Sequence, residues 1–288
     1  MLWVLSAVMV VGVAPTAVGR PAPPVVTPVP AWTSDAPGWT WQRSADGVVY
    51  DSPHGRFLVR DLPEGWRSIA DEHAAHGGGR GALGYPVDRE RSDTADPWTR
   101  ERTFQRFERG IVYRGGWTAT TLYRSPITQL HLRNGGGGGW LNYPVTNEIT
   151  QGSQHRYQEF RLTVLYDSPS GTYVTAGNLM GLHRGLGGGR TVGYPTGPDT
   201  VQAPGYRFQT FERTTIYCFP HPYTGREQCS DVSGTVRRVH DAHGGGTGSL
   251  GYPMQRVVQR ANGDEWQLFE RGSISVSPSG ATVTYSRP

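Results

Sequence analysis

Four copies of one sequence unit run along this chain, and this internal repeat constrains the fold more than any other feature. In each copy a glycine run leads to a Tyr-Pro pair, and an alternating polar and aromatic segment follows. The prolines of the pairs are Pro86, Pro144, Pro195 and Pro253, so their spacings are 58, 51 and 58 residues. Such self-similarity is typical of arrays in which each unit packs against its neighbours. We therefore expect one repeat array rather than unrelated domains.

Each copy has a glycine-rich part and a strand-like part. The stretches from the glycine run to the proline are residues 77–86, 135–144, 187–195 and 244–253. The strand-like stretches that follow are residues 104–113, 157–166, 208–217 and 266–272. A fifth, partial copy at residues 41–50 has the strand-like part without its own Tyr-Pro pair. The sequence thus predicts five strand pairs and four glycine-rich connections.

The strand-like part of the first full copy shows how each unit folds. Polar and apolar residues alternate with a period of two over residues 105–110, which indicates a β-strand. Residues 112–113 continue in the same way, so we expect Arg109-Gly110 to be a bulge or tight turn with a positive φ. The chain then returns through residues 118–123. Each copy is therefore predicted to hold a small β-hairpin or meander.

Short helices are expected between the hairpins, each ending at a glycine run. They cover residues 65–76, 127–133, 179–184 and 236–243. The fold class is thus mainly β, a tandem array of about five β-hairpin units with short helices. A hairpin of this size cannot bury a core alone. We expect the units to close into a propeller-like ring with pseudo-fivefold symmetry, the N-terminal half copy completing the ring. An open solenoid is the alternative arrangement.

The two ends of the chain differ in composition from the repeats. Residues 1–19 are apolar and end in Ala17-Val18-Gly19, which indicates a secretory signal peptide; a membrane anchor is the alternative. Residues 20–38 form a Pro-rich spacer, and residues 39–288 form the repeat domain. Its expected parts are a half repeat at 39–64 and units at 65–124, 125–176, 177–233 and 234–288. No other apolar stretch is long enough to cross a bilayer, so no membrane span is expected in the mature chain.

Charge and cysteine content limit the classes of partner. All 28 basic residues are Arg, and they are spread among the repeats, with a formal net charge of +4. Nucleic-acid binding needs a concentrated basic face, and the sequence has none. The two cysteines, Cys218 and Cys229, flank a turn-rich segment, and in a secreted chain they are expected to close a hairpin as a disulfide. A catalytic or metal-binding thiol is the rival interpretation.

Histidine and glutamate recur in the repeats, and each has a functional and a structural interpretation. A histidine stands four residues before every glycine run, and two copies add a second, which invites a metal hypothesis. We prefer packing or capping at the helix end, and expect no metal or cofactor. The repeated Phe-Glu-Arg places Glu108, Glu212 and Glu270 in equivalent positions, whereas one active site needs one set of residues. We therefore expect a structural ion pair or hydrogen-bonding node and no catalytic residue.

These repeats resemble the LGFP repeat family of secreted actinobacterial cell-envelope proteins. The resemblance rests on Leu83-Gly84-Tyr85-Pro86 with residues 105–110, and on Leu250-Gly251-Tyr252-Pro253 with residues 267–272. The second copy departs from the pattern, since Asn142 replaces the motif glycine and Arg161-Leu162 replaces Arg-Gly. The resemblance covers roughly residues 40–285 and implies an association with the cell wall, through arabinogalactan or peptidoglycan.

Aromatic residues are the natural candidates for contact with such a ligand, because rings stack on sugar faces. The candidate ligand-binding residues are Trp117, Trp140, Tyr223, Tyr85, Tyr143, Tyr194, Tyr252, His73, His131, His183 and His240. We therefore expect a secreted, cell-wall-associated, non-catalytic protein, a monomer that binds cell-wall polysaccharide through several weak sites. The alternatives are a secreted hydrolase of wall polymers and a protein-docking scaffold for a wall enzyme.

Overall fold

The computed structural model describes residues 31–92, 102–116 and 118–286, and it consists mainly of five four-stranded antiparallel sheets. Each sheet is a meander in which strands adjacent in the chain are adjacent in space. The first sheet comprises β1 (Thr33–Ala36), β2 (Trp39–Ser44), β3 (Gly47–Ser52) and β4 (Gly55–Arg60), and the second β5 (Arg91–Ser92), β6 (Arg102–Phe107), β7 (Gly110–Gly115) and β8 (Thr118–Tyr123). The third comprises β9 (Ile149–Gln151), β10 (His155–Glu159), β11 (Thr163–Ser168) and β12 (Gly171–Ala176). The fourth comprises β13 (Thr200–Ala203), β14 (Tyr206–Thr210), β15 (Thr214–Pro220) and β16 (Glu227–Ser233), and the fifth β17 (Val258–Gln259), β18 (Glu265–Phe269), β19 (Gly272–Ser277) and β20 (Gly280–Tyr285).

A short helix precedes each of the last four sheets, as predicted from the sequence. These helices are α1 (Ile69–Ala75), α2 (Pro126–Arg133), α3 (Gly177–Gly185) and α5 (Gly234–Ala242). Each glycine run then forms a further single turn, namely η1 (Gly78–Arg80), η2 (Gly136–Gly138), α4 (Gly188–Thr191) and η3 (Gly245–Thr247). The residue before each of these turns is a glycine in the left-handed region, for example Gly77 with φ +88°, a conformation that glycine adopts at little cost. No helix among the described residues has the length and apolar character needed to span a lipid bilayer.

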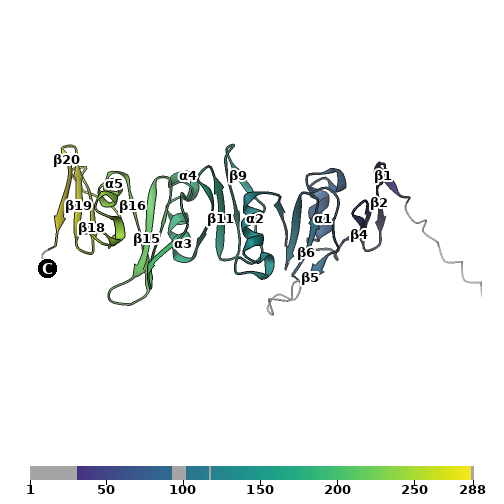
Figure 1. Ribbon diagram of the computed structural model, residues 1–288, viewed down its shortest axis with the longest axis horizontal. Coiled ribbons are helices and arrows are strands. Elements are labelled where there is room, and N and C mark those ends of the chain that lie inside the picture. Colours follow the sequence, from purple (N-terminus) through teal and green to yellow (C-terminus); the bar gives the residue numbers. More distant parts are fainter. Residues whose placement is uncertain (1–30, 93–101, 117, 287–288) are drawn as a thin grey trace, which may run out of the picture.

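The sheets lie in a row along the long axis of the molecule, with the first and last at opposite ends (Figure 1). The expected propeller-like ring is therefore not found, and the N-terminal unit does not complete a circle with the last one. The open stack is the arrangement observed. Each helix contacts the sheet before it and the sheet after it, for example α1 with β4 and β7, so every connection places the next sheet further along the same direction.

The hydrophobic core lies between consecutive sheets rather than inside any one of them. The first cluster combines Tyr50 and Val59 of the first sheet, Ile69 of α1, and Phe107 and Val112 of the second sheet. A single meander has too little apolar surface to bury alone. The stack is stable because every unit shares a core with its neighbour. We use the word junction for the contact between two consecutive sheets.

A buried glutamine bridges each junction through hydrogen bonds to two backbone carbonyls. The Nε2 of Gln158 donates to Thr121 O in the second sheet at 3.1 Å and to Thr146 O at 2.9 Å. Its counterparts Gln105, Gln209 and Gln267 make the equivalent pairs of bonds. All four glutamines are 0% exposed. Each one therefore fixes a sheet to its predecessor through groups that would otherwise be buried without a partner.

Two local expectations are corrected by the structure. The first unit is a complete four-stranded sheet, because β1 lies inside residues 20–38, where a spacer was expected. Gly110 does not have a positive φ, and Arg109 lies in an ordinary two-residue turn. Glycine is required there for space, since a Cβ at Gly110 would lie 2.6 Å from Leu122 O. The expected signal peptide, residues 1–19, lies outside the described residues.

Candidate functional site

The histidine of each repeat lies at the centre of a junction. His73 is 1% exposed; its Nε2 donates to Gly84 O at 2.8 Å, and its Nδ1 accepts from the Tyr50 hydroxyl at 3.3 Å. Its ring also stacks on Phe107, with a centroid distance of 4.4 Å. His73 thus joins the first sheet, α1, the Tyr-Pro turn and the second sheet.

The other three histidines repeat the Nε2 bond of His73, and His183 also repeats the Nδ1 bond, with Tyr166. His131, His183 and His240 are each 0% exposed, and their Nε2 atoms bond to the carbonyls of Asn142, Gly193 and Gly251 at 2.8–3.0 Å. Burial lowers the pKa of all four rings, that of His73 to about 4, so they are neutral at physiological pH. The described residues contain no group of three or more His, Cys, Asp or Glu side chains suited to a metal ion. The structure therefore places these four candidates in the core.

The four Tyr-Pro tyrosines are also mostly buried, and the hydroxyl groups of three of them reach the first strand of the preceding sheet. The Tyr85 hydroxyl donates to Asp35 at 2.7 Å, and the Tyr194 hydroxyl donates to Gln151 at 3.1 Å. The Tyr252 hydroxyl donates to Gln202. Burial is the main reason why the pKa values of Tyr194 and Tyr252 rise to about 12. The rings of Tyr194 and Tyr252 form walls of the grooves described below.

The repeated Glu-Arg pair holds the glycine turn in place. Glu270 Oε2 accepts a hydrogen bond from the Tyr252 amide at 3.1 Å, and Arg271 donates to Ser249 O at 3.1 Å. Glu108 and Arg109 make the equivalent bonds to Tyr85 N and to Ala82 O, each at 3.0 Å. The pair thus acts as a hydrogen-bonding node, in line with the sequence interpretation.

Grooves open at three of the junctions, each lined by a glycine turn and by aromatic residues of the preceding sheet. At the first junction a groove of about 500 Å³ is lined by Trp41, Tyr50 and Arg80. At the third, a groove of about 310 Å³ is lined by Tyr157, Tyr194 and other residues. At the fourth, the groove measures about 880 Å³. Grooves of this size, with apolar walls and a few polar groups, are typical of ligand sites.

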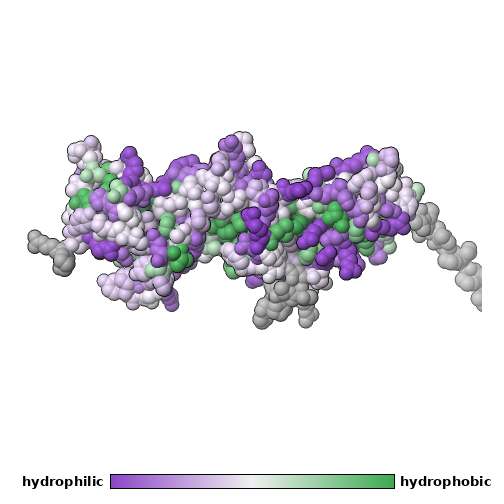
Figure 2. Space-filling model, viewed as in Figure 1, coloured by the Kyte–Doolittle hydropathy of each residue, from purple (hydrophilic) through white to green (hydrophobic). Residues whose placement is uncertain are grey.

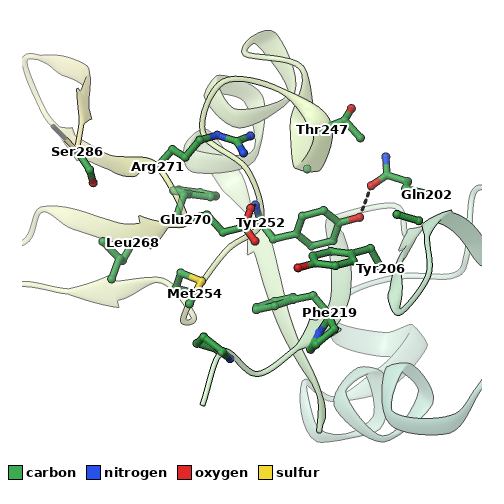
Figure 3. Close-up of a pocket in the computed structure, with 15 residues that line it drawn as sticks. Gln202, Tyr206, Phe219, Thr247, Tyr252, Met254, Leu268, Glu270, Arg271 and Ser286 are labelled. Carbon is green, nitrogen blue, oxygen red and sulfur yellow. Dashed lines mark hydrogen bonds between the residues drawn. The ribbon is translucent and has the colours of Figure 1, made fainter. Parts of the chain in front are cut away.

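The groove at the fourth junction, called here the fourth groove, combines aromatic walls with polar groups (Figure 3). The rings of Tyr206 and Tyr252 meet edge to face, with centroids 5.0 Å apart. In Figure 3 the Tyr252 hydroxyl points toward Gln202, whereas the Tyr206 hydroxyl points toward the end where Glu270 lies. The remaining lining residues are Ala203, Phe219, Pro220, Pro222, Gly246, Thr247, Met254, Leu268, Phe269, Arg271 and Ser286.

The predicted disulfide is present and shapes one wall of the fourth groove. Cys218 and Cys229 are joined at an S–S distance of 2.00 Å and pair across β15 and β16. Phe219 and Pro220, which directly follow Cys218, line the groove. The hairpin extends beyond the disulfide to Tyr223, which is 91% exposed at its tip. The disulfide thus fixes the part of the hairpin that lines the fourth groove.

The remaining tryptophan candidates have different outcomes. Trp140 lies just after the glycine turn η2 and is 61% exposed. Its indole N–H donates to Asn134 Oδ1 at 2.9 Å, but it lines none of the grooves described above. Trp117 lies outside the described residues.

The sequence reasoning missed one position on the second strand of each of the first four sheets, which packs on the tyrosine of the next unit. Trp39, His155 and Tyr206 occupy this position and contact Tyr85, Tyr194 and Tyr252 at centroid distances of 4.7–5.0 Å. At the second junction Arg102 lies over the Tyr143 ring, 5.0 Å from its centroid. Aligning the repeats on the buried glutamine would have revealed this position as a column of aromatic or cationic residues.

On the face shown in Figure 2, hydrophobic residues reach the surface in separate small patches along the molecule, surrounded by polar residues.

A scan against protein-family models gives no match, and neither does a search of curated proteins. Similar solved structures include the extracellular domains of BT4673 and BT3049 from B. thetaiotaomicron, with sequence identities of 10% and 9% and a TM-score of 0.16 each. The matches cover 89% of this chain but 31% and 34% of those chains, so this chain spans about a third of their length. Backbones that superpose this poorly support no argument about fold or function.

Proposed function

We propose that this protein is secreted and non-catalytic, and that it binds glycans of the actinobacterial cell wall in the grooves at its junctions. The observation that carries this proposal is the fourth groove, whose volume is about 880 Å³. Its walls include Tyr206 and Phe219, and polar groups such as Glu270 stand beside them. The C–H face of a sugar ring packs on aromatic rings, while its hydroxyl groups need hydrogen-bond partners.

The row of sheets suits a polymeric ligand. Grooves of related construction recur at the first and third junctions, so one extended glycan has several places to bind. Individually weak contacts add up when they are linked on one rigid body, because each later contact is intramolecular. An extended stack with repeated grooves therefore supports retention on an insoluble wall.

Secretion is supported by the disulfide and by the sequence resemblance. Disulfides persist mainly outside the reducing cytosol, and Cys218–Cys229 is formed in the structure. The apolar N-terminal run and the likeness of the repeats to LGFP sequences point in the same direction. The resemblance supplies the choice of the actinobacterial wall, with arabinogalactan and peptidoglycan as the two candidate glycans.

The hydrolase alternative has less support, because the row of sheets forms no ring channel (Figure 1) and Glu72, a fully buried acid, has a structural place. Glu72 is 0% exposed, and other repeats have Leu130 or Leu182 at this position. Its Oε2 pairs with the Arg67 guanidinium at 2.8 Å, and its Oε1 accepts bonds from other side chains. Those donors are His76, Thr121 and Asn147, at 2.9–3.0 Å. A carboxylate so fully bonded is suited to holding α1 against the second sheet.

Co-sedimentation with purified actinobacterial walls tests the proposal. Intact arabinogalactan–peptidoglycan is compared with acid-stripped peptidoglycan, and the supernatant is assayed for newly released reducing sugar. Binding to the intact wall without sugar release is the expected result. Binding that disappears after stripping assigns the ligand to arabinogalactan, and equal binding assigns it to peptidoglycan. Absence of binding would favour the docking scaffold, and sugar release would favour the hydrolase.

A further inference from the structure

The fourth groove differs from its counterparts in the charges that surround the repeated glutamate. At the first junction Glu108 Oε1 bonds to His54 Nε2 at 3.2 Å, and at the third Glu212 Oε1 bonds to His155 Nε2 at 3.1 Å. At the fourth, Glu270 uses Oε2 for the Tyr252 amide, and among the described residues no side chain forms a hydrogen bond to its Oε1. The exposed Glu270 thus presents a carboxylate oxygen that can accept a hydrogen bond from a ligand.

A basic residue is also missing from the glycine turn of this groove. The first and third grooves carry Arg80 and Arg190 at this position, and Arg80 pairs with Asp35 at 2.9 Å. In the fourth groove the equivalent residue is Thr247. Arg271 remains nearby, but its guanidinium donates to the carbonyls of Gly248 and Ser249. The groove therefore offers an open carboxylate oxygen without a dedicated cation.

The aromatic surface of the fourth groove is better suited to a ring-shaped ligand than that of the third. Tyr206 replaces His155, so the residue that bonds the glutamate in the third groove becomes a phenol ring in the fourth. Tyr206 is half-buried, and its hydroxyl points toward the Glu270 end of the groove (Figure 3). The disulfide hairpin adds Phe219 and Pro222. The volume of about 880 Å³, against about 310 Å³ in the third groove, leaves room for more than one sugar ring.

We propose that the fourth groove is the principal ligand site and that it takes a neutral oligosaccharide rather than an anionic one, an inference that rests on the proposed function. A sugar ring packs on Tyr206, and one of its hydroxyl groups donates to Glu270 Oε1. A hydrogen bond to a carboxylate is stronger than one between neutral groups. A ligand carboxylate or phosphate at the same place meets the like charge of Glu270, and the nearby Arg271 guanidinium is already engaged by the carbonyls of Gly248 and Ser249.

Calorimetric titration of the full chain with a matched pair of ligands tests this inference. The neutral probe is the oligosaccharide fraction released from purified actinobacterial walls by mild acid. The anionic probe is the same fraction after oxidation of its primary hydroxyl groups to carboxylates. We expect the wild-type protein to bind the neutral probe at least tenfold more tightly. Tyr206→Ala is expected to weaken neutral binding by tenfold or more.

Glu270→Gln provides the sharper variant, because it keeps the shape of the side chain and an oxygen acceptor for the Tyr252 amide. It is expected to weaken neutral binding about fivefold and to reduce the preference for the neutral probe. Glu212→Gln is the matched control, since the same change is made at the third junction. The affinity of the control variant for the neutral probe is expected to lie within twofold of that of the wild-type protein.

Equal affinity for the two probes, or unchanged neutral binding in both Tyr206→Ala and Glu270→Gln, would overturn the inference. If these results came with normal co-sedimentation on walls, the proposed function would stand and only this assignment of the site and ligand class would fall. If the wild-type protein did not co-sediment with walls at all, the proposed function itself would be refuted. The two failures are therefore distinguishable.

Discussion

The side-chain oxygen of Asn142 accepts a hydrogen bond from the backbone amide of Tyr143 at 2.8 Å. In the second and fifth sheets a glutamate accepts the equivalent amide bond. In the second copy of the motif Arg161 follows Phe160, the counterpart of Phe107, so it takes the glutamate position and not the arginine position expected from the sequence. Asn142 is also the only non-glycine residue with a positive φ, +65°, among the described residues. Two departures from the motif thus compensate each other, since asparagine tolerates the left-handed conformation and supplies the missing acceptor.

Replacing Asn142 by alanine is expected to destabilise the protein by roughly 2–3 kcal/mol. Alanine would be strained at φ +65°, and the Tyr143 amide would lose its acceptor. Urea denaturation followed by circular dichroism measures the effect. Asn142→Asp is the control, because aspartate retains both the acceptor and the tolerance of this conformation. An Asn142→Ala protein as stable as the Asn142→Asp protein would contradict this explanation of the second motif.

Gln158 is expected to couple the two halves of the stack. Gln158→Leu leaves Thr121 O and Thr146 O without their donor and should cost about 2–3 kcal/mol. Because each unit is stabilised by its neighbours, weakening a central junction should also broaden or split the urea transition. Gln154→Leu, at an exposed position, serves as the control. A single sharp transition at the wild-type midpoint for Gln158→Leu would show that this bridge is dispensable.

Stability is expected to fall as the solution is acidified below pH 6.5. Burial lowers the pKa of His73 from its usual 6.5 to about 4, so between these values the unfolded chain binds a proton that the folded chain does not. The contribution of the neutral His73 ring to the free energy of unfolding is therefore complete above pH 6.5 and is lost as the pH falls to about 4. His73 alone accounts for roughly 3 kcal/mol, and the pKa values of the three equivalent rings shift in the same direction.

Urea denaturation at pH 7.5, 6 and 5 measures this dependence. His73→Gln is expected to be less stable at pH 7.5 and to show a shallower decline with acidification. His221→Gln, which changes a ring at the tip of the disulfide hairpin, should keep the wild-type decline. A decline in His73→Gln as steep as that of the wild-type protein would assign the acid sensitivity to other groups.

Reduction of Cys218–Cys229 should weaken both stability and glycan binding. The disulfide closes a short loop, so its loss is expected to cost about 2–3 kcal/mol. It also fixes Phe219 at the wall of the fourth groove, so affinity for the neutral oligosaccharide should fall in reducing agent. A double variant with alanine at both cysteines should not respond to reductant. Unchanged affinity after verified reduction would separate the hairpin from the site.

Much of the fold follows from local sequence signals. The glycine runs mark the turns after the helices, and the alternation over residues 105–110 correctly indicates a strand. The prediction of a closed ring was wrong. The angle between units is set by contacts at the junctions, such as those of Gln158 and His131, and not by the sequence pattern inside a unit. The repeat period specifies that neighbours pack, whereas closure depends on small rotations that accumulate along the array.

The candidate site was harder to infer from the sequence than the fold. His73 and Tyr85 recur because they build every junction, so repetition marked core residues as well as exposed ones. The groove that we favour is defined by non-repeated features, namely Tyr206, Thr247 and the open side of Glu270. Unless the repeats are aligned with one another on the buried glutamine, the sequence gives no reason to select Tyr206.

Hydrogen–deuterium exchange of the full chain, with and without the neutral wall oligosaccharides, tests the central claim most directly. The account predicts slower exchange in residues 200–206, 244–254 and 266–272, which border the fourth groove, and weaker protection at the glycine turns of the first and third grooves. Protection confined to segments away from every groove, such as the turn between β19 and β20 at residues 277–280, would contradict it.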